Sequence, residues 1–214
     1  MPESARMVAK DSTRLLIVSN AITVVAALVL HWPIETLMWP YWIQSVIIGW
    51  YSRRRMLALH QFSTEGFTSN GQPVPETPRA LRSTANFFAI HYGFFHLGYL
   101  VFLWQHIDKL SRWDWLAFAG LSVSFVMSHG ASFRQNLAAD VRGRPNLGAL
   151  LFLPYLRILP MHLTLIFGRA IGGDGAGALL LFGVLKTLAD VGMHYADHKM
   201  LQRGVTDAAF PPAG

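Results

Sequence analysis

The sequence predicts an all-α membrane protein, a polytopic bundle of about six transmembrane helices. Two observations predict this fold. Hydrophobic residues make up 52% of the 214 residues and charged residues only 14%, whereas soluble domains carry about 25% charged residues. The apolar residues also form long blocks instead of alternating with polar ones, which excludes a porin-like barrel. Most blocks approach the roughly 20 residues that a helix needs to cross the hydrocarbon core.

The predicted spans follow one another with no room for a separate soluble domain, so residues 1–203 form one transmembrane domain. Pro33, a run of three arginines at 53–55 and a glycine-rich turn at 172–175 separate neighbouring spans. A polar, proline-bearing segment at 61–82 is the longest loop, and we expect its centre to be mobile. The tail at 204–214 is expected to be disordered. The spans are residues 15–32, 34–51, 84–104, 113–133, 147–168 and 176–199.

The basic residues of the loops predict the orientation of the bundle. With the N-terminus inside, thirteen Lys and Arg residues fall on the inner side and three on the outer side. By the positive-inside rule both termini are therefore cytoplasmic, and we expect a multi-pass protein of the bacterial inner membrane. The outer three are Lys109, Arg112 and Arg169. The outer interface also receives six tryptophans: Trp32, Trp39, Trp42, Trp104, Trp113 and Trp115.

Composition narrows the classes of partner and site. The chain contains no cysteine, which excludes disulfides and thiolate metal sites. Its net charge of +6 is explained by loop residues that set orientation, and no basic stretch is interleaved with aromatics as in nucleic-acid binding. The expected partners are membrane lipids and a second copy of the chain in a homo-oligomer.

Charged residues inside the spans are the main pointer to function. Arg157 and Lys186 lie within predicted spans, where a charge costs about 2.5–3.5 kcal/mol and must face the bundle interior. Along the last span Lys186, Asp190, His194 and His198 recur every four residues, so they form one polar stripe on one helix face. The stripe is long for an accidental feature within lipid.

The spacing of this stripe predicts an intramembrane metal site. Two histidines four residues apart on a helix can direct their imidazoles at one ion. Asp190, one turn earlier, is a third ligand or orients one from the second shell. Counting residues from the inner ends of the spans puts further candidates near the same depth. These are His91, His96 and His129, and His162 joins them only if a proline breaks the fifth span.

The leading functional hypothesis is a metalloprotein, with zinc as the preferred ion, that hydrolyses a lipid or amide substrate. A zinc-bound water ionises near neutral pH and supplies the nucleophile. In this hypothesis Asp190 orients a ligand or acts as base. Lys186 or Arg157 stabilises the developing oxyanion.

Three other interpretations use the same residues. Iron, copper or a haem held by one histidine from each of two helices would give a redox protein. Intramembrane Lys, Arg, Asp and His also form the substrate sites and proton relays of transporters. Finally, the polar residues can be structural in an assembly partner, with Asp190 paired to Lys186 or Arg157. In the same way Ser19, Asn20, Gln44 and Ser45 are expected to form interhelical hydrogen bonds.

Four segments resemble a bacterial family of small polytopic membrane proteins of unknown function. They are Tyr41–Gly49, Phe87–His96, Arg157–His162 and Lys186–Asp190. This resemblance implies a six-span fold and no particular activity. A weaker similarity, carried by His194 and His198, is to the membrane hydrolases related to alkaline ceramidases and progestin-type receptors. It implies zinc bound by an HxxxH in the last span, although those proteins have seven spans.

Overall fold

The computed structural model describes residues 3–172 and 175–209, and within these ranges the side chains of 3–12, 169, 194 and 196–209 are outside the description. The described chain is all-α, apart from a two-stranded hairpin. Its elements are α1 (Glu3–Val29), α2 (Glu35–Leu57), β1 (Thr68–Ser69), β2 (Gln72–Pro73), α3 (Pro78–Trp104), η1 (Ile107–Lys109), α4 (Arg112–Arg142), α5 (Leu147–Phe152), η2 (Leu153–Arg157), α6 (Ile158–Gly172) and α7 (Ala176–Ala209).

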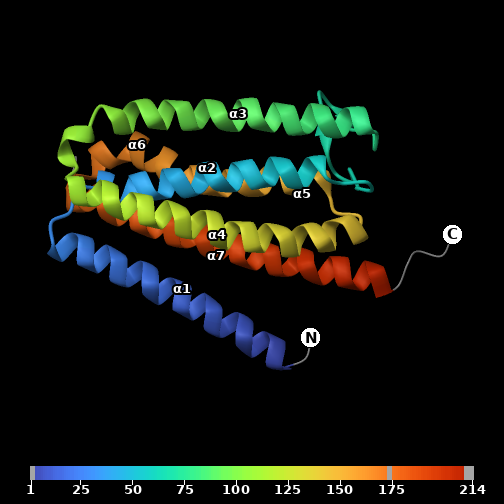
Figure 1. The fold of residues 1–214 in the computed structure, drawn as a ribbon, viewed down its shortest axis with the longest axis horizontal. Helices are drawn as coiled ribbons and strands as arrows, with labels where there is room; N and C mark the ends of the chain where they lie inside the picture. Colours follow the sequence, from blue (N-terminus) through green and yellow to red (C-terminus); the bar gives the residue numbers. More distant parts are fainter. Residues whose placement is uncertain (1–2, 173–174, 210–214) are drawn as a thin grey trace.

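The long helices lie roughly side by side and α2 is central (Figure 1). α2 packs against α3 on one side and α4 on the other, while α7 packs against α6 and α1. α1 contacts mainly α7, and toward its N-terminus it diverges from the other helices. The core between the helices is apolar and aromatic, with Met38, Phe88, Leu103 and Phe182 almost fully buried.

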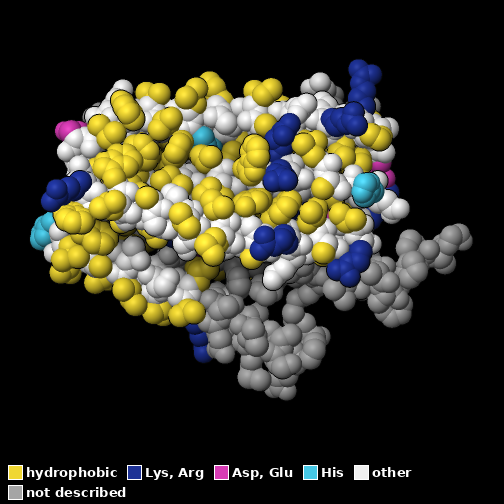
Figure 2. All heavy atoms as spheres, in the orientation of Figure 1, with side chains coloured by type: hydrophobic (Ala, Val, Ile, Leu, Met, Phe, Trp, Pro, Cys, Tyr) yellow, Lys and Arg dark blue, Asp and Glu magenta, His cyan; other side chains and the backbone are white. Residues whose placement is uncertain are grey.

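The outer faces of these helices are suited to lipid, so the protein is a membrane protein. Within the described part of the chain, four helical segments are long and apolar enough to cross a membrane: Pro78–Trp104, Arg112–Arg142, Leu147–Gly168 and Ala176–Met193. In the most apolar window of the second of these, only 11% of residues are buried, so most of α4 faces outward. Hydrophobic side chains cover most of the face in Figure 2, and Lys and Arg lie mostly toward the end where α2 meets the hairpin.

Local sequence signals explain where the helices begin and end. At the start of α3 the Thr77 side chain accepts a hydrogen bond from the Ala80 N–H, and Pro78 occupies the first helical turn. At the start of α4, Ser111 and Asp114 form a reciprocal capping box. The turn after α1 contains His31 with φ of 52°.

The helices extend beyond the predicted spans at their charged ends. α2 continues through the three arginines to Leu57, and α4 continues to Arg142. α7 includes residues 204–209 of the tail for which the sequence predicts disorder, and 210–214 lie outside the described residues. No proline or glycine interrupts the chain in these extensions except Gly204, so the hydrogen-bonded ladder continues past the apolar block.

The loop between α2 and α3, for which the sequence predicts a mobile centre, contains a hairpin and backbone hydrogen bonds. Asn70 and Gly71 have φ of 51° and 75° and form the tight turn of the β1–β2 hairpin. The loop also docks on the start of α5. The Ser63 N–H donates to the Pro145 carbonyl at 2.9 Å, and the Leu147 N–H donates to the Ser63 carbonyl at 2.8 Å.

The fifth predicted span is interrupted, whereas the sequence predicts one continuous helix. α5 has six residues, η2 is a 3₁₀ segment of five residues, and α6 resumes at Ile158. The change comes at Pro154, which has no N–H to donate to the α-helical ladder. The break is therefore not at Pro160, which lies in the first turn of α6.

Replacing Gly49 by alanine should weaken the packing of α2 on α3. A Cβ at Gly49 would lie 2.5 Å from Tyr92 Cε1, and the Tyr92 ring is fixed by its 2.7 Å hydrogen bond to Ser45. Overpacking of this kind costs about 1–3 kcal/mol. Thermal unfolding of the purified protein should start at a lower temperature in Gly49→Ala. Gly93→Ala is the matched control, because a Cβ there meets nothing within 4 Å.

Docking of the α2–α3 loop should depend on pH through Glu76. The hydrogen bond from Arg144, followed by the one from the Thr64 N–H, lowers the pKa of Glu76 below its ordinary value of 4.5. The ionised contact is fully present above pH 4.5 and is lost as the pH falls through the lowered pKa. Hydrogen exchange in residues 61–74, corrected for the intrinsic rate, should speed up in that acid range.

The matched variants for this measurement are Glu76→Gln and Glu65→Gln. Glu76→Gln should show the faster exchange already at neutral pH and little further acid response. Glu65 is exposed on the same loop, so Glu65→Gln should behave as the wild type. Equal profiles for all three proteins would show that Glu76 does not anchor the loop.

Candidate functional site

The site is a cavity of about 900 Å³ whose walls come mainly from α1, α2, α4, η2 and α7, with Leu150 of α5. At one end its lining includes Trp32 and Trp113, and at the other it includes Arg55 and Asn136. These pairs lie near opposite ends of the helices, so the cavity extends along most of their length. Some lining side chains stay exposed, including Trp113 at 65% and Leu121 at 41%, so the cavity is open to the outside of the bundle.

A cluster of three charged side chains lies on the wall of this cavity. Asp190 Oδ2 accepts a hydrogen bond from Lys186 Nζ at 2.7 Å, and Asp190 Oδ1 lies 3.5 Å from Arg157 Nη1. Asp190 and Arg157 are about nine-tenths buried, with exposed fractions of 10% and 11%, and Lys186 is 28% exposed. The carboxylate is therefore shared by two cations from different segments.

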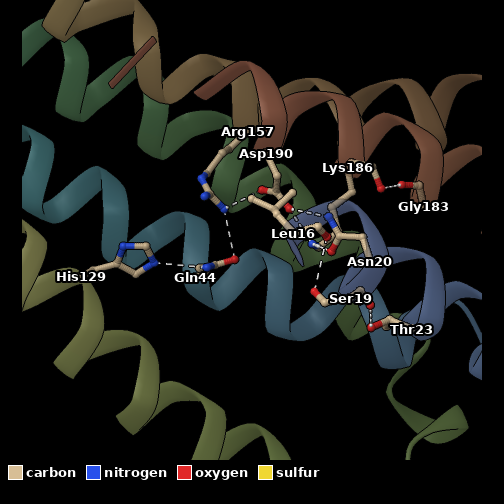
Figure 3. A network of polar contacts seen from close by, with 11 residues as sticks. Leu16, Ser19, Asn20, Thr23, Gln44, His129, Arg157, Gly183, Lys186 and Asp190 are labelled. Carbon is tan, nitrogen blue, oxygen red and sulfur yellow. Dashed lines mark hydrogen bonds and ion pairs between the residues drawn. The ribbon is translucent and has the colours of Figure 1, made fainter. Parts of the chain in front are cut away.

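Amides from two further helices complete the cluster. Asn20 of α1 donates to Asp190 Oδ2 at 3.2 Å and accepts from Lys186 Nζ at 2.7 Å. Gln44 of α2 accepts from Arg157 Nη1 at 3.1 Å, and its Nε2 lies 3.2 Å from His129 Nε2 of α4. Figure 3 shows this continuous network, which links five segments of the chain.

The backbone explains why these side chains meet. Lys186 and Asp190 are four residues apart on α7, and side chains at this spacing lie one above the other on the same helix face. Arg157 is the last residue of η2, so the interruption of the fifth span fixes the point from which it reaches Asp190. Asn20 approaches because α1 and α7 pack closely, with Val24 against Gly183.

Two hydrogen-bonding groups that line the cavity have no partner among the described residues. They are Arg157 Nε and the hydroxyl of Tyr41, both fully buried. The Tyr41 ring packs edge-on against Phe182 with centroids 5.4 Å apart, and Lys186 Nζ lies 5.9 Å from the centroid of the Tyr41 ring. Buried polar groups are nearly always hydrogen-bonded, so two unsatisfied groups beside one cavity point to a ligand.

Charge in the cluster is not balanced by the described side chains. Arg157 and Lys186 carry two positive charges and Asp190 carries one negative charge. Isolated charges are costly in a low-dielectric interior, and the paired ones still carry a desolvation penalty. The cluster of described side chains therefore holds one excess positive charge on the wall of the cavity.

A second polar group lies on the opposite side of α2, where α2 meets α3. Ser45 Oγ lies 2.9 Å from His96 Nε2 and 2.7 Å from the Tyr92 hydroxyl. His96 Nδ1 lies 2.8 Å from the Tyr92 carbonyl, and Trp42 donates to the His96 carbonyl at 2.9 Å. All of these atoms have protein partners, so the group acts as an internal polar contact between helices.

The histidines predicted as ligands are dispersed among different neighbours. His91 is exposed on α3, stacks on Phe87 with centroids 5.1 Å apart, and its Nδ1 lies 2.9 Å from the Tyr155 hydroxyl. His162 Nδ1 lies 3.2 Å from the Tyr99 hydroxyl, away from the charge cluster. Of the four described histidines proposed as ligands, His129 alone belongs to the network of Arg157 and Asp190.

The side chains of His194 and His198, the two principal predicted ligands, lie outside the described residues. Within the described part of the chain, no three His, Asp or Glu side chains come together as a possible metal site. The structure does bring together the three charged residues predicted to assist catalysis, Asp190, Lys186 and Arg157.

Some members of the site are not evident from the sequence. Tyr41 stands in an apolar segment, and its position three residues before Gln44, on the same face of α2, is the one available signal. The sequence likewise does not predict the ion pair between Arg55 and Asp140, because it places both charged residues in loops between the spans. Asn20 and Gln44 form the interhelical hydrogen bonds that the sequence predicts. The prediction is wrong for Ser19, whose hydroxyl donates to the Leu16 carbonyl of its own helix at 3.4 Å.

Comparisons with known proteins identify the family without assigning an activity. No curated protein and no solved structure matches the chain, so the similarity to alkaline-ceramidase-type hydrolases gains no support. One family model, described as "Family of unknown function (DUF6498)", matches residues 3–206. Because this match covers nearly the whole sequence, the chain belongs to that family of unknown function.

Proposed function

We propose that the protein is a small membrane carrier that binds an amphipathic molecule in the cavity between α1, α2, α4 and α7. The observation that carries this proposal is the cluster of Arg157, Lys186 and Asp190 on the wall of a cavity that extends along the helices. Ionisable residues within a membrane typically mark substrate pathways, because a purely structural role is fulfilled at lower cost by neutral residues.

The interrupted fifth span supports a binding role. Discontinuous helices are a common feature of membrane transporters, where the break exposes backbone groups or re-aims a side chain at the substrate site. Here the break at Pro154 precedes Arg157, the residue that contacts Asp190. A continuous α-helix would direct the residue at 157 differently, because a 3₁₀ segment advances about 120° per residue instead of 100°.

The shape and composition of the cavity favour an amphiphile. Its volume of about 900 Å³ is near the upper end of the range for small-molecule sites. Apolar side chains such as Leu121, Phe125 and Phe182 line it around the polar cluster. A molecule with an apolar chain and a polar head would match both parts of the wall and would enter from the bilayer past α1 and α4.

In the proposed carrier, Asp190 competes with the ligand for the two cations. While Asp190 is bound to Lys186 and Arg157, both cations are stabilised without ligand. A ligand head that interacts with Arg157 weakens one of these pairs, so binding changes the contacts between η2 and α7. This coupling of a site to helix packing is the kind of differential contact that a carrier requires.

Filling the cavity should remove the bound molecule. Ala117 lines the cavity on α4, whereas Ala119 is exposed outside it. We expect an amphiphile to co-purify with the wild type in near-stoichiometric amount, as seen by mass spectrometry of the organic extract. Ala117→Trp should lose it and Ala119→Trp should retain it. If no amphiphile distinguishes the two variants, the carrier proposal fails and the cluster is left with a structural role.

The proposed topology has six spans, with both termini in the cytoplasm of a bacterial inner membrane. α1 and α2 are the two additional spans, and the charge bias of the loops sets their direction. Because the chain has no cysteine, single cysteines report topology directly. Ser69→Cys in the hairpin should resist a membrane-impermeant maleimide in intact cells, and Asp108→Cys should react. The opposite labelling pattern would invert the proposed orientation.

A metal-dependent hydrolase is the second candidate, favoured by His194 and His198, which follow Asp190 at one and two helical turns. Elemental analysis of the purified protein tests it, with Asp190→Asn and His194→Ala as variants. A hydrolase requires stoichiometric zinc that His194→Ala loses, whereas the carrier proposal expects none. An absorption band of haem in the visible range would instead indicate the redox alternative.

A further inference from the structure

We infer that the amphiphile bound in the cavity carries a single negative charge on its head, and that Arg157 and Tyr41 recognise this head. The inference rests on the proposed carrier function and names the class of its ligand. It stands on three observations: the charge balance of the cluster, its unpartnered donors and its position in the cavity.

Charge balance argues for one negative charge. The described cluster contains Arg157, Lys186 and Asp190, and so carries one more positive charge than negative charge. The other ionised residues that line the cavity do not offset it. Arg55 is paired with Asp140, and Asp114 caps the start of α4. A monoanion beside the cluster would make it neutral, whereas a cation would raise its charge.

The free donors argue for an oxygen acceptor. Arg157 uses Nη1 on Gln44 and Asp190, and its buried Nε has no partner among the described residues. The Tyr41 hydroxyl is likewise unpartnered and buried, and it can donate to an anion. A guanidinium presents its N–H groups in a fixed fork that suits the two oxygens of a carboxylate or a phosphate.

The surroundings argue that the anion belongs to an amphiphile and not to a free ion. Phe118, Leu121 and Phe125 of α4 line the cavity beside the polar residues. A small inorganic anion would leave this apolar wall without contact. A fatty-acid-like molecule would direct its carboxylate to Arg157 and its chain along the apolar residues toward an open part of the wall.

Photocrosslinking tests this inference on the full chain in nanodiscs of neutral phosphatidylcholine. The probe is dodecanoic acid with a diazirine on its chain, used at about pH 9, well above the ordinary carboxyl pKa. We expect the label on cavity-lining residues of α4 and α7. Four competitors of equal chain length are then compared: dodecanoate, dodecyl methyl phosphate, dodecanol and dodecyltrimethylammonium. The two anions should suppress labelling at lower concentration than the alcohol or the cation.

The variants assign recognition to named residues. Arg157→Gln should require about tenfold more dodecanoate for the same suppression, because it removes a charge-assisted hydrogen bond. Tyr41→Phe should require severalfold more, since it removes a hydroxyl and leaves the ring. Arg79→Gln, exposed on α3 outside the cavity lining, is the matched control and should equal the wild type. If Arg157→Gln does not fold, Tyr41→Phe alone still tests whether the head of the amphiphile is recognised at this site.

The outcomes separate the inference from the proposed function. Equal suppression by dodecanol or by the ammonium compound would overturn the anionic head and leave the amphiphile carrier intact. If the probe labels no cavity-lining residue, both the inference and the proposed carrier function are wrong. Stronger suppression by either anion than by the alcohol and the ammonium compound upholds the inference, and the more effective anion identifies the source as a fatty acid or a phospholipid-type diester.

Discussion

The shared carboxylate of Asp190 is the interaction on which the interior of this protein depends. Two cations within a membrane-embedded bundle are tolerable only when a counter-charge lies in direct contact with them. Lys186 reaches Asp190 along one helix face, but Arg157 reaches it from a different segment. The pairing therefore draws η2 to α7, and Asn20 then ties α1 to the same point. Three parts of the chain are positioned by one side chain.

The central helix α2 separates two polar regions with different properties. Toward α3, Ser45 and His96 have protein partners for the polar atoms that face each other. Toward the cavity, Gln44 connects Arg157 to His129, and the neighbouring Tyr41 hydroxyl has no partner among the described residues. A satisfied network rigidifies an interface, whereas an unsatisfied one invites a ligand. The contrast is the reason to look for function on the α4 and α7 side of α2.

The sequence predicts the membrane character and the helices well because both follow from the composition of long blocks. The apolar segments largely coincide with the observed helices, although the first runs three residues past the end of α1 at Val29. The charged residues inside them, Arg157, Lys186 and Asp190, do meet. Periodicity suffices for this, since residues four apart on a helix share a face and intramembrane charges need partners.

Other features depend on tertiary contacts that no local pattern contains. The sequence predicts the position of His91 along α3, but not the direction in which its side chain points. That side chain is exposed and lies beside Tyr155. The break at Pro154 is similarly ambiguous, because proline is tolerated in many membrane helices. The docked hairpin depends on pairing between residues 63 and 146, which are far apart in the chain. Tyr41 joins the site through the contact of its ring with Phe182 of α7.

Docking of the α2–α3 loop on the start of α5 has a mechanical consequence. α5 has six residues and could not hold its position alone, yet the backbone hydrogen bonds between Ser63 and Leu147 fasten it to the loop. From Leu147 to Arg157 the chain runs through α5 and η2 without an intervening loop. The docked loop and the buried Arg157 side chain therefore lie at the two ends of one segment, residues 147–157, which is eleven residues long. A molecule that binds the docked loop would therefore shift the position of the Arg157 guanidinium.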